Sequence, residues 1–221
     1  MDTSKLIAEA EEEWLQKWAE GPTRTRWDRI PLQVGDAAPD LELQDSSGAL
    51  RKLSASWHGQ PALLLFWRHY GCSCGRDRAA RLLQEYVQYK ELGAKVLVIG
   101  QGEPARAAAY AERNHIPCPV LCDPTFLAYR AYDVLEGKPS QVVFDASDEH
   151  LKCDLKTGQE MAESRHGTER ATVDSPWQLP GEFVVDNKGV VRLAYRYQYC
   201  EDWPNPLVLV AAIKEAIWET A

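Results

Sequence analysis

Apolar and polar residues follow regular periods along most of the chain, and these periods predict its helices and strands. Near the N-terminus, apolar residues recur every four positions from Leu6 to Trp18, which predicts an amphipathic helix that ends before Gly21. Two alternating segments, 40–43 and 50–53, then flank a turn and predict a β-hairpin. The first part of the chain is therefore expected to form a helix, a linker and a hairpin.

Three short apolar runs dominate the middle of the chain, at 62–67, 95–99 and 119–122. The first run is continuously apolar and the other two are apolar apart from Lys95, which is typical of strands that are buried on both faces of a sheet. Helical patterns at 73–92 and 104–113 separate the three runs. This β-α-β-α-β order predicts an α/β fold with a parallel sheet and right-handed crossovers.

The C-terminal third begins with a polar, irregular segment at 135–176, which we interpret as an insertion on the domain. Two strands follow at 182–186 and 190–199, joined by a hairpin turn at Gly189. A last helix is expected to begin at Pro206. We expect its buried face to consist of Leu207, Val210, Ala211, Ile217 and Trp218.

The chain is expected to divide into an N-terminal helical extension and linker at 1–32 and one domain at 33–221. The N-terminal helix has an apolar face that needs a partner. We expect the helix to dock either on its own domain or on a partner subunit. A homodimer is therefore one of the two alternatives.

Charge narrows the choice of partners. The net charge of −8 and the pI near 5.2 make nucleic acid and anionic membranes poor partners. The chain has no run of about 20 apolar residues, and acids occupy 11–13 where a signal peptide would be apolar. We therefore expect a cytoplasmic protein.

The six cysteines of a cytoplasmic protein start as thiols, and a close pair is typical of catalysis, redox sensing or metal binding.

Cys72 has the surroundings of a reactive thiol. It follows the strand predicted at 62–67 and precedes a helix that begins near Ser73. Unpaired N–H groups at a helix N-terminus stabilise a thiolate, and Arg68 adds positive charge. The alternative is a buried cysteine that only packs in the core. We favour Cys72 as the nucleophile and expect its pKa to lie below the ordinary value.

Cys74 is the first candidate to pair with an oxidised Cys72. Residues two apart lie on different sides of a helix, so a direct disulfide would require non-helical backbone at Ser73. Cys74 could instead pack inside or be the nucleophile itself, and Cys200 could resolve Cys72. His69 could be a base, a residue lining the site, or a metal ligand together with the two cysteines. Because a structural zinc site usually has four ligands, we expect no metal and no other cofactor.

Segments 34–40, 119–124 and 179–189, and the basic pair Arg68-His69 shortly before Cys72, form a set of motifs. The three segments resemble the entry motif, the third-strand motif and the cis-proline loop with its strand and turn in the alkyl hydroperoxide reductase and thiol-specific antioxidant (AhpC/TSA) family. The basic pair is similar to that of peroxiredoxin-like proteins. The resemblance runs from about residue 33 to the C-terminus, apart from the insertion.

The resemblance implies a thioredoxin-like fold, in which helices flank a central mixed β-sheet, with an added N-terminal helix and hairpin. It implies a thiol peroxidase or disulfide oxidoreductase in which Cys72 attacks a hydroperoxide or a disulfide, and Cys74 is the resolving thiol. Trp67, Tyr70 and Pro180 would line the substrate groove, with Pro180 in a cis peptide that faces Cys72. A thioredoxin-type protein or a low-molecular-weight thiol would be the reductant.

The chain also departs from the family pattern P-x-x-x-T/S-x-x-C, in which the proline and the hydroxyl residue shape the peroxide pocket. Leu65 and His69 stand at these two positions before Cys72. Pro180 replaces an arginine that peroxiredoxins carry, which leaves Arg68 to stabilise a thiolate. Two alternatives stay open: a thioredoxin-fold protein that binds partners or senses redox state without turnover, and a metal-handling protein with a C-x-C pair.

Overall fold

The computed structural model describes residues 3–20, 29–137 and 177–218, together with positions 142, 148, 152, 156 and 175. The chain divides into two units, Met1–Pro31 and Leu32–Ala221. The first contains helix α1 (Thr3–Glu20), as the four-residue periodicity predicted. The docking of α1 on its own domain or on a partner subunit stays a prediction. Within the described ranges, no helix is both long and apolar enough to cross a membrane.

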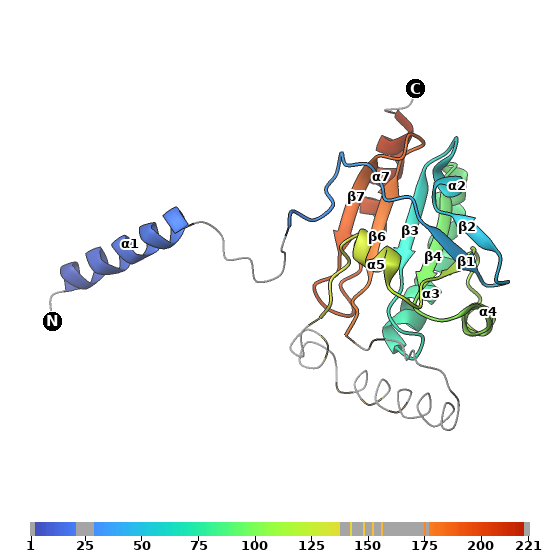
Figure 1. Ribbon diagram of the computed structural model, residues 1–221, viewed down its shortest axis with the longest axis horizontal. Helices are drawn as coiled ribbons and strands as arrows, with labels where there is room; N and C mark the ends of the chain where they lie inside the picture. Colours follow the sequence, from blue (N-terminus) through green and yellow to red (C-terminus); the bar gives the residue numbers. More distant parts are fainter. Residues whose placement is uncertain are drawn as a thin grey trace. The chain divides into compact units, whose positions relative to one another are not determined.

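The second unit contains a seven-stranded sheet in the order β2-β1-β5-β4-β3-β6-β7, as far as the described residues extend (Figure 1). Its strands are β1 (Glu42–Asp45), β2 (Leu50–Lys52), β3 (Ala62–Phe66), β4 (Lys95–Gly100), β5 (Val120–Cys122), β6 (Gly181–Val185) and β7 (Val191–Arg196). The central strands β3, β4 and β5 are parallel, and β1, β2, β6 and β7 add antiparallel pairings. The predicted hairpins and parallel crossovers are confirmed, and the sheet is mixed.

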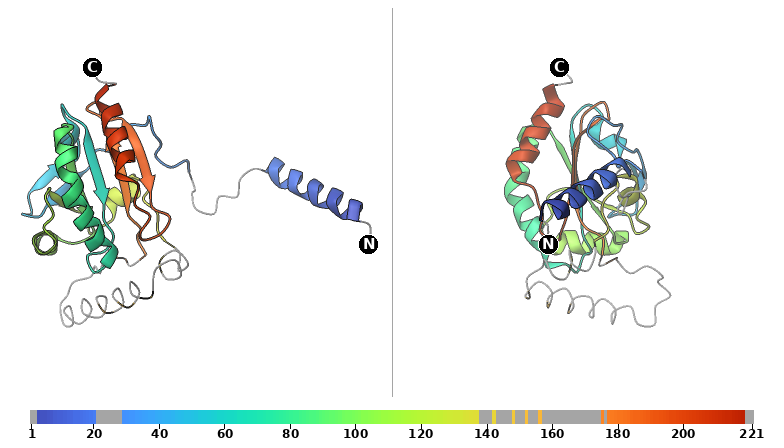
Figure 2. Two further views of the ribbon diagram at one scale, coloured as in Figure 1. Left: turned by 180° about the vertical axis from the view of Figure 1, so that it is seen from behind. Right: turned by 90° about the vertical axis from the view of Figure 1, so that its left-hand side faces the viewer.

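Helices cover both faces of this sheet (Figure 2). Along β3, Leu63 and Leu65 point into one core, whereas Leu64 and Phe66 point into the other. The first core is covered by α3 (Ser73–Glu91), α4 (Pro104–Arg113) and α7 (Pro206–Trp218), and the second by α2 (Ser54–Trp57) and α5 (Leu127–Ala131). Full burial of one such leucine stabilises the fold by about 1.5–3 kcal/mol, which explains why β3 is apolar at every position.

Helix α7 exposes part of the face that was expected to be buried. Leu207 is 69% exposed and Trp218 is 77% exposed, while Leu209 and Ile213 are buried against the sheet. Ala211 is exposed as well, so the prediction of Leu207, Ala211 and Trp218 as buried residues is wrong. The helix is apolar around most of its circumference, so periodicity alone does not select the face that packs.

The short helix α5 was not predicted, because its stabilising contact involves a single side chain. The carboxylate of Asp123 accepts hydrogen bonds from the backbone N–H groups of Leu127 and Ala128, at 2.8 and 2.7 Å. These groups would otherwise lack partners at the start of the helix. Phe126 precedes the helix in a left-handed conformation with φ 58°.

Most of the insertion predicted at 135–176 lies outside the described residues. Its two ends meet, because Gly137 N donates to Trp177 O at 2.6 Å and Leu179 N donates to Leu135 O at 3.0 Å. The two described ends of the insertion are therefore held side by side, directly before β6.

Candidate functional site

The loop between β3 and α3 positions Cys72 at the start of a helix. Trp67 N donates to Ile99 O at 2.8 Å, which continues the strand by one residue. The backbone then turns, and Cys72 N donates to His69 O at 3.1 Å. Cys72 is the N-cap of α3 with extended backbone, φ −74° and ψ 133°. The sequence predicted this placement, and the positive end of the helix dipole favours a thiolate there.

Cys72 and Cys74 form a disulfide, with their Cα atoms 5.3 Å apart. We expected that such a bridge would require non-helical backbone at Ser73, and this was wrong, since α3 begins at Ser73. The extended backbone lies one residue earlier, at Cys72, and this is sufficient to bring the two side chains together. Cys72 is 1% exposed and Cys74 is 2% exposed, so both sulfur atoms are shielded from bulk solvent.

A buried arginine lies against the first of these sulfur atoms. Arg68 Nη1 donates to Cys72 Sγ at 2.8 Å, and the arginine side chain is buried with the disulfide. Hydrogen bonds to an ionised partner are about twice as strong as neutral ones. The contact therefore gains strength when Cys72 becomes a thiolate, and the guanidinium favours that charged form.

Tyr70 is held in place by two glycines at the end of β4. Its ring stacks on Tyr110 at 4.4 Å between centroids, and Trp67 Nε1 donates to Tyr110 Oη at 2.9 Å. A Cβ atom on Gly100 or Gly102 would collide with the Tyr70 ring. The glycine pair thus makes room for the aromatic side chain that precedes Cys72 in the loop.

A narrow cavity of about 10 Å³ lies beside Cys74, with room for about one water molecule. It brings together several predicted site residues, namely Trp67, Arg68, Cys74, Pro180 and Cys200. Leu65, Phe66, Gly75, Arg78, Glu182, Tyr197 and Trp203 complete its walls. Three other predicted residues, Cys72, His69 and Tyr70, do not line this cavity. Cys200 therefore shares a space with Cys74 and not with Cys72.

Pro180 lines the cavity beside Cys74, and that it faces Cys72 stays a prediction, but its peptide bond does not have the expected geometry. No cis peptide occurs in the described ranges, so the Leu179–Pro180 bond is trans. Here the backbone is bonded on both sides: Leu179 N donates to Leu135 O, and Pro180 O accepts from Tyr197 N at 3.2 Å. This pairing extends the β6–β7 hairpin, and trans is the more stable form for most X–Pro bonds.

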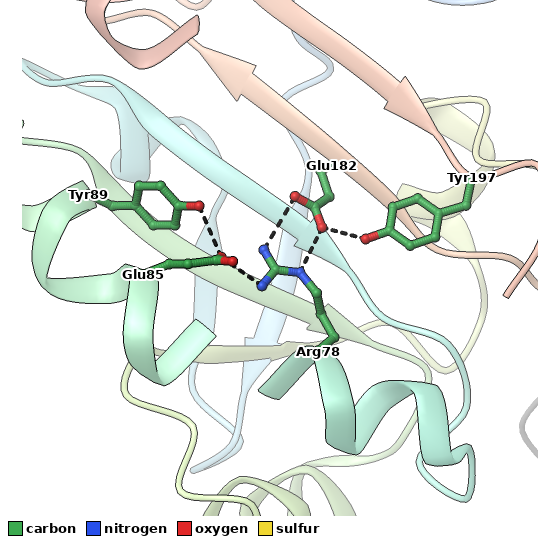
Figure 3. A network of polar contacts seen from close by, with 5 residues as sticks. All are labelled: Arg78, Glu85, Tyr89, Glu182 and Tyr197. Atoms are coloured by element: carbon green, nitrogen blue, oxygen red, sulfur yellow. Dashed lines mark hydrogen bonds and ion pairs between the residues drawn. The ribbon is translucent and has the colours of Figure 1, made fainter. Parts of the chain in front are cut away.

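A buried ionic network that was not found in the sequence joins α3 to β6 and Tyr197 (Figure 3). Three of its residues, Arg78, Glu182 and Tyr197, line the same cavity. Arg78, one turn after Cys74 on α3, donates from Nε to Glu182 at 2.8 Å and from Nη1 to Glu85 at 2.9 Å. The hydroxyl of Tyr197 donates to Glu182 at 2.5 Å, and the hydroxyl of Tyr89 donates to Glu85 at 3.0 Å. One guanidinium is thus shared between two carboxylates.

In this network, burial and the neighbouring carboxylates shift the pKa of Arg78 in opposite directions. Burial alone would lower the pKa of Arg78, but the carboxylates of Glu182 and Glu85 raise it well above the ordinary value. Burial, with the charge of Glu182, raises the pKa of Tyr197 well above its ordinary value. At neutral pH the arginine is therefore a cation and the tyrosine is a neutral hydrogen-bond donor.

Two further cysteines, Cys118 just before β5 and Cys122 at its end, are core residues. Burial raises the pKa of Cys118 to about 12 and that of Cys122 to about 11, so both are protonated at neutral pH. Cys153 lies outside the described residues. Among the residues that the structure describes, no group of three or more His, Cys, Asp or Glu side chains could hold a metal ion.

Comparison with known proteins assigns this chain, with its helix-capping cysteine beside a buried arginine, to a family. A sequence model of the AhpC/TSA family matches residues 34–194, which is more than half of the chain. The chain belongs to the AhpC/TSA family. In this AhpC/TSA chain, the loop that contains Cys72 follows strand β3 and precedes helix α3.

Relatives of this AhpC/TSA protein are distant in sequence. It is 28% identical over 104 residues to the thioredoxin-like protein AAED1, chloroplastic, of Arabidopsis thaliana, which covers 47% of this chain and 42% of that protein. It is 25% identical over 173 residues to peroxiredoxin Q, chloroplastic, of Populus jackii, covering 76% and 62%. The chain spans less than two thirds of the length of either relative.

A solved structure supports the fold. Peroxidoxin BcpB from Mycobacterium tuberculosis superposes with a TM-score of 0.56 at 17% identity, over 85% of this chain and 97% of that chain. The predicted thioredoxin-like fold is confirmed.

Proposed function

We propose that this AhpC/TSA protein is a thiol-dependent oxidoreductase of the peroxiredoxin-like type, in which Cys72 is the nucleophile and Cys74 is the resolving thiol. The observation that carries the proposal is the 2.8 Å contact from Arg68 Nη1 to Cys72 Sγ, next to a disulfide between Cys72 and Cys74. The guanidinium and the helix N-terminus together favour a thiolate on Cys72. The disulfide shows that Cys74 lies within bonding distance of it.

With a hydroperoxide, the Cys72 thiolate attacks the terminal oxygen and the O–O bond breaks. The departing oxygen takes a proton and leaves as an alcohol or water, and Cys72 becomes a sulfenic acid. The Cys74 thiol then attacks the sulfur of Cys72, water leaves, and the disulfide forms. With a disulfide substrate, Cys72 displaces one thiolate and Cys74 displaces the second. A thioredoxin-type protein or a low-molecular-weight thiol returns the two electrons.

Burial favours a small substrate. The two cysteines are almost fully covered, and the cavity beside Cys74 has a volume of only about 10 Å³. A folded protein could not bring its own disulfide into contact with Cys72, which is only 1% exposed. We therefore favour a small hydroperoxide over a protein disulfide, with entry after local opening of the loops around the site.

We place the reaction in the cytosol. Cys118 and Cys122 are thiols outside any disulfide, as is usual in a reducing compartment. The names of the two curated relatives assign those proteins to chloroplasts. Localisation of a fluorescently tagged chain separates the two compartments.

The burial of both cysteines also favours a second candidate function. A disulfide that a substrate cannot reach would suit a redox sensor, in which oxidation of the pair changes binding to another protein without turnover. Such a protein would react slowly with all oxidants.

Stopped-flow fluorescence tests the proposal, because Trp67 and Trp203 line the cavity next to Cys74. The reduced protein is mixed with hydrogen peroxide, cumene hydroperoxide or oxidised glutathione. We expect fast oxidation of the wild type by at least one of them. Cys72→Ser should abolish the fast phase, and Cys118→Ser, a buried control, should leave it unchanged. Inertness of the wild type towards all three oxidants would favour the sensor, and an unchanged fast phase in Cys72→Ser would overturn the assignment of the nucleophile.

A further inference from the structure

A third cysteine, Cys200, lines the cavity beside Cys74. Cys200 is on the loop between β7 and α7, is 3% exposed, and is not part of a disulfide. It lines the same narrow cavity as Cys74, whereas Cys72 does not line it. The cavity thus brings Cys74 and Cys200, from α3 and from the loop after β7, to the walls of one space.

The two sulfur atoms of the disulfide differ as leaving groups. When a thiolate attacks a disulfide, the sulfur with the lower thiol pKa leaves faster. Cys72 Sγ accepts a hydrogen bond from Arg68, which stabilises it as a thiolate. Cys74 shares its cavity with Arg78, whose charge is already shared between two carboxylates. Attack on Cys74 with departure of Cys72 is therefore the favoured direction.

We propose that Cys200 attacks Cys74 and moves the disulfide from Cys72–Cys74 to Cys74–Cys200, a step that rests on the proposed function for its oxidised starting state. The Cys200 thiol loses its proton, a bond forms between Cys200 Sγ and Cys74 Sγ, and the bond between Cys74 and Cys72 breaks. Cys72 leaves as a thiolate next to Arg68, and solvent takes up the proton. The number of disulfides is unchanged, so the step needs no additional oxidant or reductant.

The exchange links the first turn of α3 to the loop between β7 and α7. This loop is held by Asp202, which accepts from Gln198 N at 2.8 Å and from Tyr195 Oη at 3.0 Å. Arg81 of α3 stacks over Trp203 of the loop at 4.4 Å. The exchange returns Cys72 to its reactive form while the protein keeps one disulfide.

Disulfide mapping of the Cys72→Ser protein tests the proposal without depending on peroxide chemistry. The reduced variant is treated with diamide, which oxidises two neighbouring thiols directly, then alkylated, digested and analysed by mass spectrometry. We expect a peptide linked through Cys74 and Cys200. The matched control Cys72→Ser/Cys118→Ser should keep this link, and Cys72→Ser/Cys200→Ser should lose it. Oxidation that leaves Cys74 and Cys200 unlinked in a folded Cys72→Ser protein would overturn the proposal.

A labelling measurement on the full set of cysteines tests the direction of the exchange. After stoichiometric oxidation by diamide, Cys72 of the wild type should become reactive towards iodoacetamide while the protein keeps one disulfide. In Cys200→Ser, labelling of Cys72 should fall at least about tenfold, because the disulfide stays at Cys72–Cys74. Equal labelling of Cys72 in both proteins would contradict the exchange. If the proposed function fails instead, hydroperoxide leaves every cysteine reduced while diamide still produces the Cys74–Cys200 link in Cys72→Ser.

Discussion

Replacement of Arg78 by methionine tests the buried network that lines the cavity. The side chain would keep most of its volume, but Glu182 and Glu85 would remain without the cation that they share at 2.8 and 2.9 Å. Removal of one partner from a buried ion pair costs about 3–5 kcal/mol, because an uncompensated charge stays inside. For a domain of this size, each kcal/mol lowers the Tm by roughly 2–4 °C, so we expect Arg78→Met to lower it by about 6–20 °C.

Urea unfolding and thermal unfolding of the oxidised protein measure this loss. Arg51→Met removes an arginine from an exposed pair with Asp45 and should leave the midpoint nearly unchanged. Adding Glu182→Gln to Arg78→Met should restore part of the stability, with a coupling of at least about 1 kcal/mol between the two positions. A loss below about 1 kcal/mol in Arg78→Met would refute the reasoning, because the network would then contribute nothing that a neutral side chain does not.

Three further predictions concern the cysteines and the loop before α3. Arg68→Met should raise the pKa of the Cys72 thiol and slow its alkylation by iodoacetamide at pH 7 by at least about tenfold, since a hydrogen bond to a charged partner contributes about 1.5–3 kcal/mol. Gly100→Ala should destabilise the protein by about 1–3 kcal/mol in urea, because the new methyl group collides with Tyr70, and Tyr70→Leu in that background should recover part of the loss. Cys118, whose pKa burial raises to about 12, should stay protonated and unlabelled at pH 8 in the native protein; labelling as fast as in urea would contradict this burial.

The placement of Cys72 could be predicted because it depends on local signals. The apolar run before Trp67 and the helical pattern after Ser73 leave only a few residues for the turn, so Cys72 falls at the helix N-terminus. Arg68 lies four residues earlier, within the same turn. A short stretch of sequence therefore contains most of the information about this part of the site.

The other half of the site depends on residues that are far apart in the chain. Arg78 and Glu182 are 104 positions apart, and no local pattern shows that two charged side chains will be buried together. Cys200 lines the same cavity as Cys74 because β6 pairs with β3, the strand before the Cys72 loop, and β7, which precedes Cys200, pairs with β6. The trans geometry of Pro180 likewise depends on its pairing with Tyr197 across the hairpin.

The central claim is that Cys72 reacts first and that Cys74 resolves it. Reduced Cys74→Ser protein is mixed with one equivalent of hydroperoxide in the presence of dimedone, which traps sulfenic acids, and the peptides are analysed by mass spectrometry. Without the resolving thiol, the sulfenic acid should persist, and we expect the dimedone adduct on Cys72. In Cys72→Ser we expect no adduct. An adduct on Cys74 in Cys72→Ser, with none on Cys72 in Cys74→Ser, would contradict the account.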